Sequence, residues 1–208
     1  MGTFNTYGSQ KKQWGGSQPV WFTVRQKERS GGTLENVVAG TLLRAGSLVS
    51  LSTTGGVAKV IETFEVADAV STTDTTLKIK AYASHPKPVA GMVVMKSPTS
   101  ATATGEAAAL GIPTLNETDG VYEFTITAND FGALAAGDIL IKAASAGASA
   151  SIYAAPTGLT ENDVWIEDGD EYATVASVFD GEIMEDRIQP IPAFVKTLLP
   201  MIKFTKGV

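Results

Sequence analysis

The sequence predicts a mainly β protein, with many short strands in a sandwich or barrel-like body, one or two short helices and an extended N-terminal arm. The first observation is that the dipeptide Ala-Gly opens an apolar run four times, at residues 39–43, 45–49, 90–94 and 136–140. Glycine turns the backbone at no steric cost, and the apolar and branched residues that follow it suit a half-buried strand. The second is a low content of charged residues, 18%, beside abundant Gly, Ala, Ser and Thr. Each Ala-Gly unit therefore predicts a tight turn that leads into a short strand.

The distribution of charge divides the chain into an arm and a body. Residues 1–32 form a basic N-terminal arm that contains aromatic residues, and within residues 1–30 five basic residues stand against a single acid. The arm shows no helical periodicity, and residues 19–24 are its one predicted strand. Residues 33–208 form the predicted β-rich body, in which residues 65–155 are either a separate lobe or an insertion in one sandwich.

The first half of the body alternates turns with strands. Gly55-Gly56 predicts a hairpin turn between strands at residues 48–51 and 57–61. Apolar residues alternate in residues 76–82, which predicts a strand with one buried face. Residues 106–110, rich in alanine, predict a short helix after a loop.

The second half contains the clearest strand, at residues 121–127. A turn at Asn129-Asp130 follows it, and residues 131–135 predict one helical turn before the fourth Ala-Gly unit. Residues 143–155 are low in complexity and predict thin packing. Further strands are predicted at residues 163–166, 172–178 and 201–204, with an acidic turn between the first two.

A short helix is predicted near residues 192–199. Proline is well placed in the first turn of a helix, because its missing N–H has no partner there in any case, and Pro192 occupies that place. The spacing puts four apolar side chains on one face of this helix: Ile191, Phe194, Val195 and Leu198.

Residues that can carry chemistry are sparse. His85, the one histidine, precedes Pro86, which predicts a surface loop, and no Gly-x-Ser-x-Gly turn accompanies it. Asp168, Asp170 and Glu171 offer the oxygen ligands that calcium prefers, but they lack EF-hand spacing and suit an acidic β-turn. The chain has no cysteine, which excludes disulfides and metal sites that need sulfur. We expect no catalytic residue, no cofactor, no metal site and no enzymatic activity.

Charge and hydropathy restrict the partners. A net charge of −6 argues against a protein that coats nucleic acid. No stretch approaches the ~18 apolar residues of a membrane-spanning helix. The N-terminus lacks the apolar core of a secretory signal. We therefore expect a protein made in the cytoplasm, without a nucleic-acid or membrane partner.

The arm holds the candidate partner-binding residues, which are Lys11, Lys12, Trp14, Trp21 and Arg25. Tryptophan and arginine are enriched among the residues that anchor protein interfaces. An arm with two indoles can therefore dock on a partner and become ordered as it does so. In the alternative, the indoles fill the edge of the protein's own core. Stacking on nucleic acid is a third option, which the overall acidity disfavours.

The chain also contains an acidic region, whose charge is opposite in sign to that of the basic arm. Residues 161–186 contain ten acids and no lysine or arginine. The two regions can pair within one protomer or between neighbours, or both can be independently solvated faces.

The order of the motifs resembles the head decoration and head-fibre proteins of tailed bacteriophages. The resemblance covers roughly residues 35–205. It is carried by residues 38–43, 62–67, 76–80, 136–141 and 175–204, and in the last of these by Asp180-Gly181-Glu182-Ile183, Arg187-Ile188 and Ile191-Pro192.

The resemblance implies a structural virion protein on the outer capsid surface that contacts the major capsid protein and decorates or stabilises the shell, or attaches a head fibre. Compact decoration proteins are often trimers, so it also implies a homo-oligomer, made in the bacterial host cytoplasm. The length and the basic arm depart from the smallest of these proteins. One alternative is a glycan- or cell-surface-binding module, although its candidate aromatic residues are scattered: Tyr82, Tyr122, Tyr153 and Trp165. The other is an enzyme such as a cell-wall hydrolase.

Overall fold

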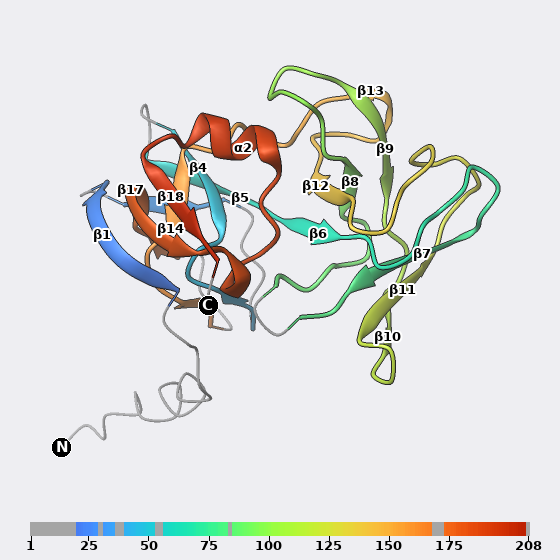
Figure 1. The fold of residues 1–208 in the computed structure, drawn as a ribbon, viewed down its shortest axis with the longest axis horizontal. Coiled ribbons are helices and arrows are strands. Elements are labelled where there is room, and N and C mark those ends of the chain that lie inside the picture. The colour runs from blue at the N-terminus through green and yellow to red at the C-terminus, as the bar shows by residue number, and fades with distance from the viewer. Residues whose placement is uncertain are drawn as a thin grey trace.

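The computed structural model describes residues 20–28, 31–35, 40–52, 56–82, 85–167 and 173–206. Strands form most of its regular structure, and α2 (Ala193–Leu198) is the one α-helix of the described residues. The predicted mainly β fold is confirmed. Figure 1 shows two groups of strands side by side, with β6 leading from the group that contains β5 to the group that contains β8 and β11.

The first group is an eight-stranded sheet built around β17. Its strands run in the order β1-β17-β14-β4-β5-β2-β16, and β18 also pairs with β17. β1 is antiparallel to β17, whereas β18 is parallel to it. The bounds are β1 (Trp21–Lys27), β2 (Gly32–Leu34), β4 (Leu48–Leu51), β5 (Val57–Ile61), β14 (Gly158–Thr160), β16 (Thr174–Val175), β17 (Ser177–Met184) and β18 (Ile202–Thr205).

The second group lies between β5 and β14 in the chain and consists of two smaller sheets. One has five strands in the order β13-β9-β8-β12-β6, and the other has three in the order β10-β11-β7. The bounds are β6 (Thr63–Glu65), β7 (Thr76–Lys80), β8 (Val93–Lys96), β9 (Gly105–Ala109), β10 (Thr114–Asn116), β11 (Val121–Thr125), β12 (Ile139–Lys142) and β13 (Gly147–Ala150). A two-stranded ribbon of β3 (Leu42–Leu43) and β15 (Val164–Trp165) completes the fold.

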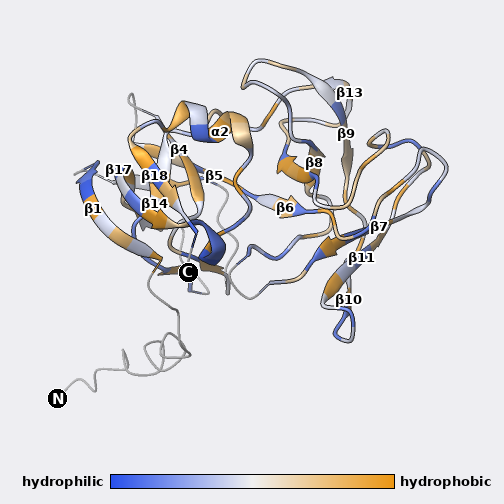
Figure 2. Cartoon of the chain, in the orientation of Figure 1, coloured by the Kyte–Doolittle hydropathy of each residue, from blue (hydrophilic) through white to orange (hydrophobic). Residues whose placement is uncertain are grey.

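One apolar core joins the two groups of strands. It packs Leu48 and Ile183 of the first group against Met95 and Ile141 of the second, and α2 adds Phe194. A second core lies inside the second group, between β6, β7, β8 and β11. Figure 2 shows apolar residues gathered on β4 and β14 in one group and on β8 in the other. Burial of apolar surface in a common core is what holds the groups together.

The Ala-Gly units form the predicted turns. Gly40, Gly46, Gly91 and Gly137 all have positive φ, from 73° to 87°. The four strands that follow them are β3, β4, β8 and β12. Positive φ is costly for residues with a Cβ, which explains why glycine recurs at this point of each unit. The prediction is confirmed, with Ala39 of the first unit outside the described residues.

Most of the other predicted elements are confirmed. β4 and β5 form the predicted antiparallel hairpin. β7 and β11 occupy the strands predicted at 76–82 and 121–127, and β18 is the predicted last strand. Thin packing, predicted for residues 143–155, holds for the exposed residues 144–149 but not for the whole range, since Ala143, Ala150 and Ile152 are buried in the shared core. The predicted strands near 163–166 and 172–178 correspond to β15, β16 and the start of β17.

Three local predictions are wrong. Residues 106–110 form β9 rather than a helix, because β9 pairs with β8 along its length and a five-residue helix is too short to nucleate alone. No helical turn forms at 131–135, since the backbone of Leu134 pairs with that of Val70. Leu198 is 42% exposed, whereas Leu199 is buried, because the chain leaves the helical conformation at Leu199.

Candidate functional site

Trp21 fixes the arm's strand to the body. Its indole Nε1–H donates to the carbonyl oxygen of Thr160 at 3.0 Å, and its ring packs at the edge of the shared core. A Cβ on Gly181 would come within 3.1 Å of the indole ring, so glycine at this position lets the indole lie close to β17. Of the alternatives for the arm's indoles, packing at the edge of the protein's own core is therefore the one that Trp21 follows.

The basic arm pairs with the acidic region within the chain. Nη1 of Arg25 lies 3.4 Å from Oδ1 of Asp180, and Nζ of Lys27 lies 2.7 Å from Oε2 of Glu161. These ion pairs accompany the backbone pairing of β1 with β17. The guanidinium of Arg25 stays largely exposed, so it can still meet a partner.

The other arm candidates are Lys11, Lys12 and Trp14, which lie outside the described residues. The structure therefore brings together Trp21 and Arg25 on β1, and sequence reasoning had not included their neighbour Phe22. Phe22 is 55% exposed, on a strand whose burial pattern leaves five of seven residues exposed. A large apolar side chain that is exposed on an edge strand is typical of a site that contacts another protein.

The structure also contains a pocket that no motif had indicated. Its volume is about 520 Å³. Its wall comes from the β3–β15 ribbon, from β5 with Glu62, from loop residues 85–89, and from Lys142, Tyr153 and Gln189. A volume of this order lies within the range of small-molecule sites. The pocket brings Tyr153 and Trp165 to one place, although the two are scattered in the sequence.

His85 stands in this wall and is half-buried, so the predicted exposed position is wrong although the loop is present. The backbone N–H of His85 donates to the carbonyl oxygen of Tyr82 at 3.1 Å, and the imidazole lies edge-on to the ring of Tyr82, with centroids 4.6 Å apart. Burial lowers the pKa of His85 to about 4, outweighing the opposite effects of Glu65 and of a hydrogen bond to the backbone of Ile188. The ring is therefore neutral at neutral pH, and its buried Nδ1 has no hydrogen-bond partner among the described residues.

Gln189 supplies a second unpartnered acceptor in the same wall. Its Nε2 donates to the carbonyl oxygen of Ile61 at 2.8 Å, and because that carbonyl accepts only, the nitrogen of the amide must face it. The atom left over is Oε1, which is buried without a partner among the described residues. Gln189 as a whole is only 2% exposed. Nothing in the sequence pattern around residue 189 predicts this role.

Most charged groups of the pocket are paired within the chain, and Lys87, which also lines it, has no ion pair among the described residues. Nζ of Lys142 lies 2.8 Å from Oε2 of Glu62 and 4.7 Å from the centre of the Tyr153 ring. Nη1 of Arg44 lies 3.5 Å from Oδ2 of Asp163. With these pairs, the pocket contains both hydrogen-bond donors and acceptors, and its electrostatic potential is not of a single sign.

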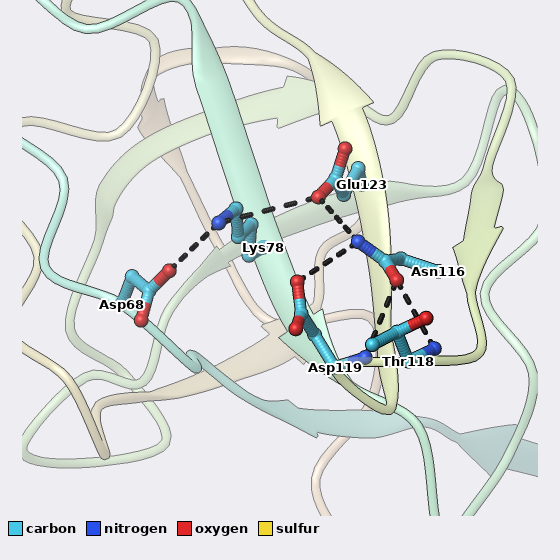
Figure 3. A network of polar contacts seen from close by, with 6 residues as sticks. All are labelled: Asp68, Lys78, Asn116, Thr118, Asp119 and Glu123. Carbon is cyan, nitrogen blue, oxygen red and sulfur yellow. Dashed lines mark hydrogen bonds and ion pairs between the residues drawn. The ribbon is translucent and has the colours of Figure 1, made fainter.

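A further polar network, at the turn between β10 and β11, is structural (Figure 3). Oδ1 of Asn116 accepts from the backbone N–H groups of Thr118 and Asp119, each at 3.2 Å, while its Nδ2 donates to Asp119 at 2.9 Å. Lys78 lies 3.1 Å from Asp68 and 4.0 Å from Glu123. The hydrogen bond that Lys78 donates to Asp68 raises the pKa of Lys78 and so favours its charged form.

The described residues include neither a metal-ligand cluster nor a membrane-spanning helix. Among them, no group of three or more histidine and acidic side chains is arranged to hold a metal ion. Asp168, Asp170 and Glu171 lie outside the described residues. None of the described helices has the length and hydropathy that crossing a membrane requires.

Comparison with known proteins returns no match: no protein-family model, no curated protein and no solved structure is similar to this chain at the level of significance used.

Proposed function

We propose that this chain is a structural virion protein that binds the outer surface of a phage capsid, where it decorates or stabilises the shell or attaches a head fibre. The observation that carries the proposal is the position of the segments that resemble head decoration and head-fibre proteins. They supply β3, β6, β7, β12, β17 and β18, which are framework strands in every sheet of the fold. The resemblance therefore runs through the framework, rather than through one surface loop.

The proposed contact with the major capsid protein lies along β1 and the arm that precedes it. β1 stands at one end of the eight-stranded sheet, among the strands that the structure describes. Its outer edge offers backbone groups for pairing, Phe22 offers apolar surface, and Arg25 offers charge. Lys11, Lys12 and Trp14 would extend this contact from the arm.

A repeating shell suits such a contact. Many copies of one weak interaction gain strength when the partner surface repeats, particularly if the bound chains form a homo-oligomer such as a trimer. The net charge of −6 reduces attraction to nucleic acid. Binding to a shell requires exposed binding surfaces and does not require a catalytic site.

Co-sedimentation with purified shells of the phage that encodes the chain tests the proposal. The full chain is compared with a truncation that lacks residues 1–19, which leaves Trp21 and the ion pairs of β1 in place. We expect the full chain to sediment with the shells and the truncation to lose about tenfold in affinity, through the loss of one anchor residue and its basic neighbours.

Two outcomes separate the parts of the proposal. If the full chain stays in the supernatant at every shell concentration, shell binding is contradicted. If both proteins bind equally, shell binding stands and the arm is removed from it. Phe22→Ala, an exposed change, then tests β1 itself.

A further inference from the structure

We propose that the pocket between the β3–β15 ribbon and loop residues 85–89 binds a neutral polyhydroxylated ligand, that is, a saccharide unit. The inference goes beyond shell binding, because it concerns a different face of the molecule from β1. It depends on three features of the pocket: its unpartnered acceptors, its paired charges and its aromatic lining.

The unpartnered acceptors call for a ligand that donates hydrogen bonds. Oε1 of Gln189 and Nδ1 of His85 are both buried in the wall and lack partners among the described residues. Oε2 of Glu62, in the same wall, also accepts no hydrogen bond, although it lies 2.8 Å from Nζ of Lys142. Gln189 and His85 both line the same pocket. A buried polar atom without a partner is costly, so a ligand hydroxyl that reaches it gains more than it would at the surface. The unpartnered atoms of Gln189 and His85 are closed to bulk water in this structure, so the ligand hydroxyl reaches them only after a side-chain shift.

Most charges of the pocket are paired, which favours a neutral ligand, and Lys87 is a lining cation without an ion pair among the described residues. Glu62 is paired with Lys142, Arg44 with Asp163, and Glu35 with Lys59 at 3.4 Å. An anion would face two lone-pair acceptors, and a free ammonium group would have to compete with Lys142 for Glu62. Hydroxyl groups both donate and accept, so a sugar suits the acceptors of Gln189 and His85 as well as the donors of Arg44 and Lys142.

The lining supplies the apolar part of the recognition. Tyr153 and Trp165 both line the pocket, and aromatic rings pack against the C–H faces of sugars while their polar ends hydrogen-bond. The volume of about 520 Å³ accommodates one or two sugar rings.

A glycan array of neutral and acidic saccharides, probed with the full labelled chain, tests the proposal. Titrations of any glycan found then compare two variants with matched controls. Gln189→Leu removes the acceptor and is matched by Gln26→Leu on exposed β1, and Tyr153→Ala removes a lining ring and is matched by Tyr122→Ala on β11. We expect a neutral saccharide to bind, with affinity about tenfold weaker in each pocket variant and unchanged in each control.

Each other outcome overturns the proposal. These are no binding at millimolar concentrations, binding of acidic glycans or inorganic phosphate only, and a neutral glycan whose affinity the two pocket variants leave unchanged. If Gln189→Leu does not fold, NMR of the wild-type chain decides. Shifts at the Gln189 side-chain amide and the Trp165 indole N–H support the site, and shifts confined to other residues overturn it. Shell co-sedimentation of Tyr153→Ala should equal that of the wild type, which keeps this proposal separable from shell binding.

Discussion

At the scale of single residues, Gly46 is a glycine for which both the backbone conformation and the surrounding atoms oppose a side chain. Its φ of +79° is unfavourable for other residues, and a Cβ there would lie 2.3 Å from Cγ2 of Ile188. Gly137 has a similar φ of +87° but open space around the same position. The pair thus separates backbone strain from overpacking.

We expect Gly46→Ala to lower the free energy of unfolding by about 3 kcal/mol, since strain and overpacking add. Gly137→Ala should lower it by about 1 kcal/mol, from strain alone. Urea denaturation of both variants measures the difference. Equal losses would show that the contact with Ile188 relaxes at no cost.

His85 gives the protein a pH dependence of known sign. Its folded pKa of about 4 lies below its ordinary value of 6.5, so in the window between these values the unfolded chain binds more protons than the folded one. Stability should therefore be full above pH 6.5 and decline as the pH falls toward 4. Glu65 opposes the lowered pKa and Lys80 adds to it, but burial dominates.

The variant His85→Gln removes this titration. Between pH 7 and pH 5 the wild type should lose about 1 kcal/mol more unfolding free energy than the variant, allowing for solvent screening of a partly exposed ring. Denaturation at the two pH values provides the measurement. An equal loss in both proteins would mean that the ring titrates normally in the folded state.

At the scale of elements, β1 has an inner anchor and an outer contact group in adjacent positions. Trp21 packs at the core edge and bonds to Thr160, whereas Phe22 is exposed. Trp21→Ala should lower the free energy of unfolding by about 3 kcal/mol and make β1 sensitive to protease. Phe22→Ala should change it by less than about 0.5 kcal/mol. Comparable losses in both would contradict the assignment of inner and outer faces.

Local signals in the sequence predict the turns and many strands. The Ala-Gly units predict turns because glycine adopts positive φ at far lower cost than most other residues, so each unit marks a turn locally. The helix predicted at 106–110 is wrong because alanine propensity is weak beside the pairing of β9 with β8. A pairing partner far along the chain cannot be read from a local window.

The candidate sites also differ in how far the sequence alone can predict them. Charge counts leave open whether the basic arm and the acidic region pair, and the ion pair of Arg25 with Asp180 shows that they do so within one chain. The pocket could not be predicted, because His85, Tyr153 and Gln189 meet only after strands from both groups are in place. Residue type alone also gives no sign that Oε1 of Gln189 lacks a partner.

At the scale of the whole molecule, the shared core makes the two groups of strands one cooperative unit. Residues of β8, β9 and β12 pack with residues of β4, β5 and β17 in that core. We expect a single calorimetric unfolding transition whose van't Hoff and calorimetric enthalpies agree. Two resolved transitions would show that the part between β5 and β14 is an independently stable lobe.

Shell binding is the central claim, and quantitative mass spectrometry of gradient-purified phage particles tests it most directly. Intact particles are analysed before and after treatment with a protease that does not enter the shell. The chain should be present at a constant ratio to the major capsid protein, and the protease should remove it while the capsid protein survives. A chain that is abundant in infected cells but missing from purified particles would contradict the claim.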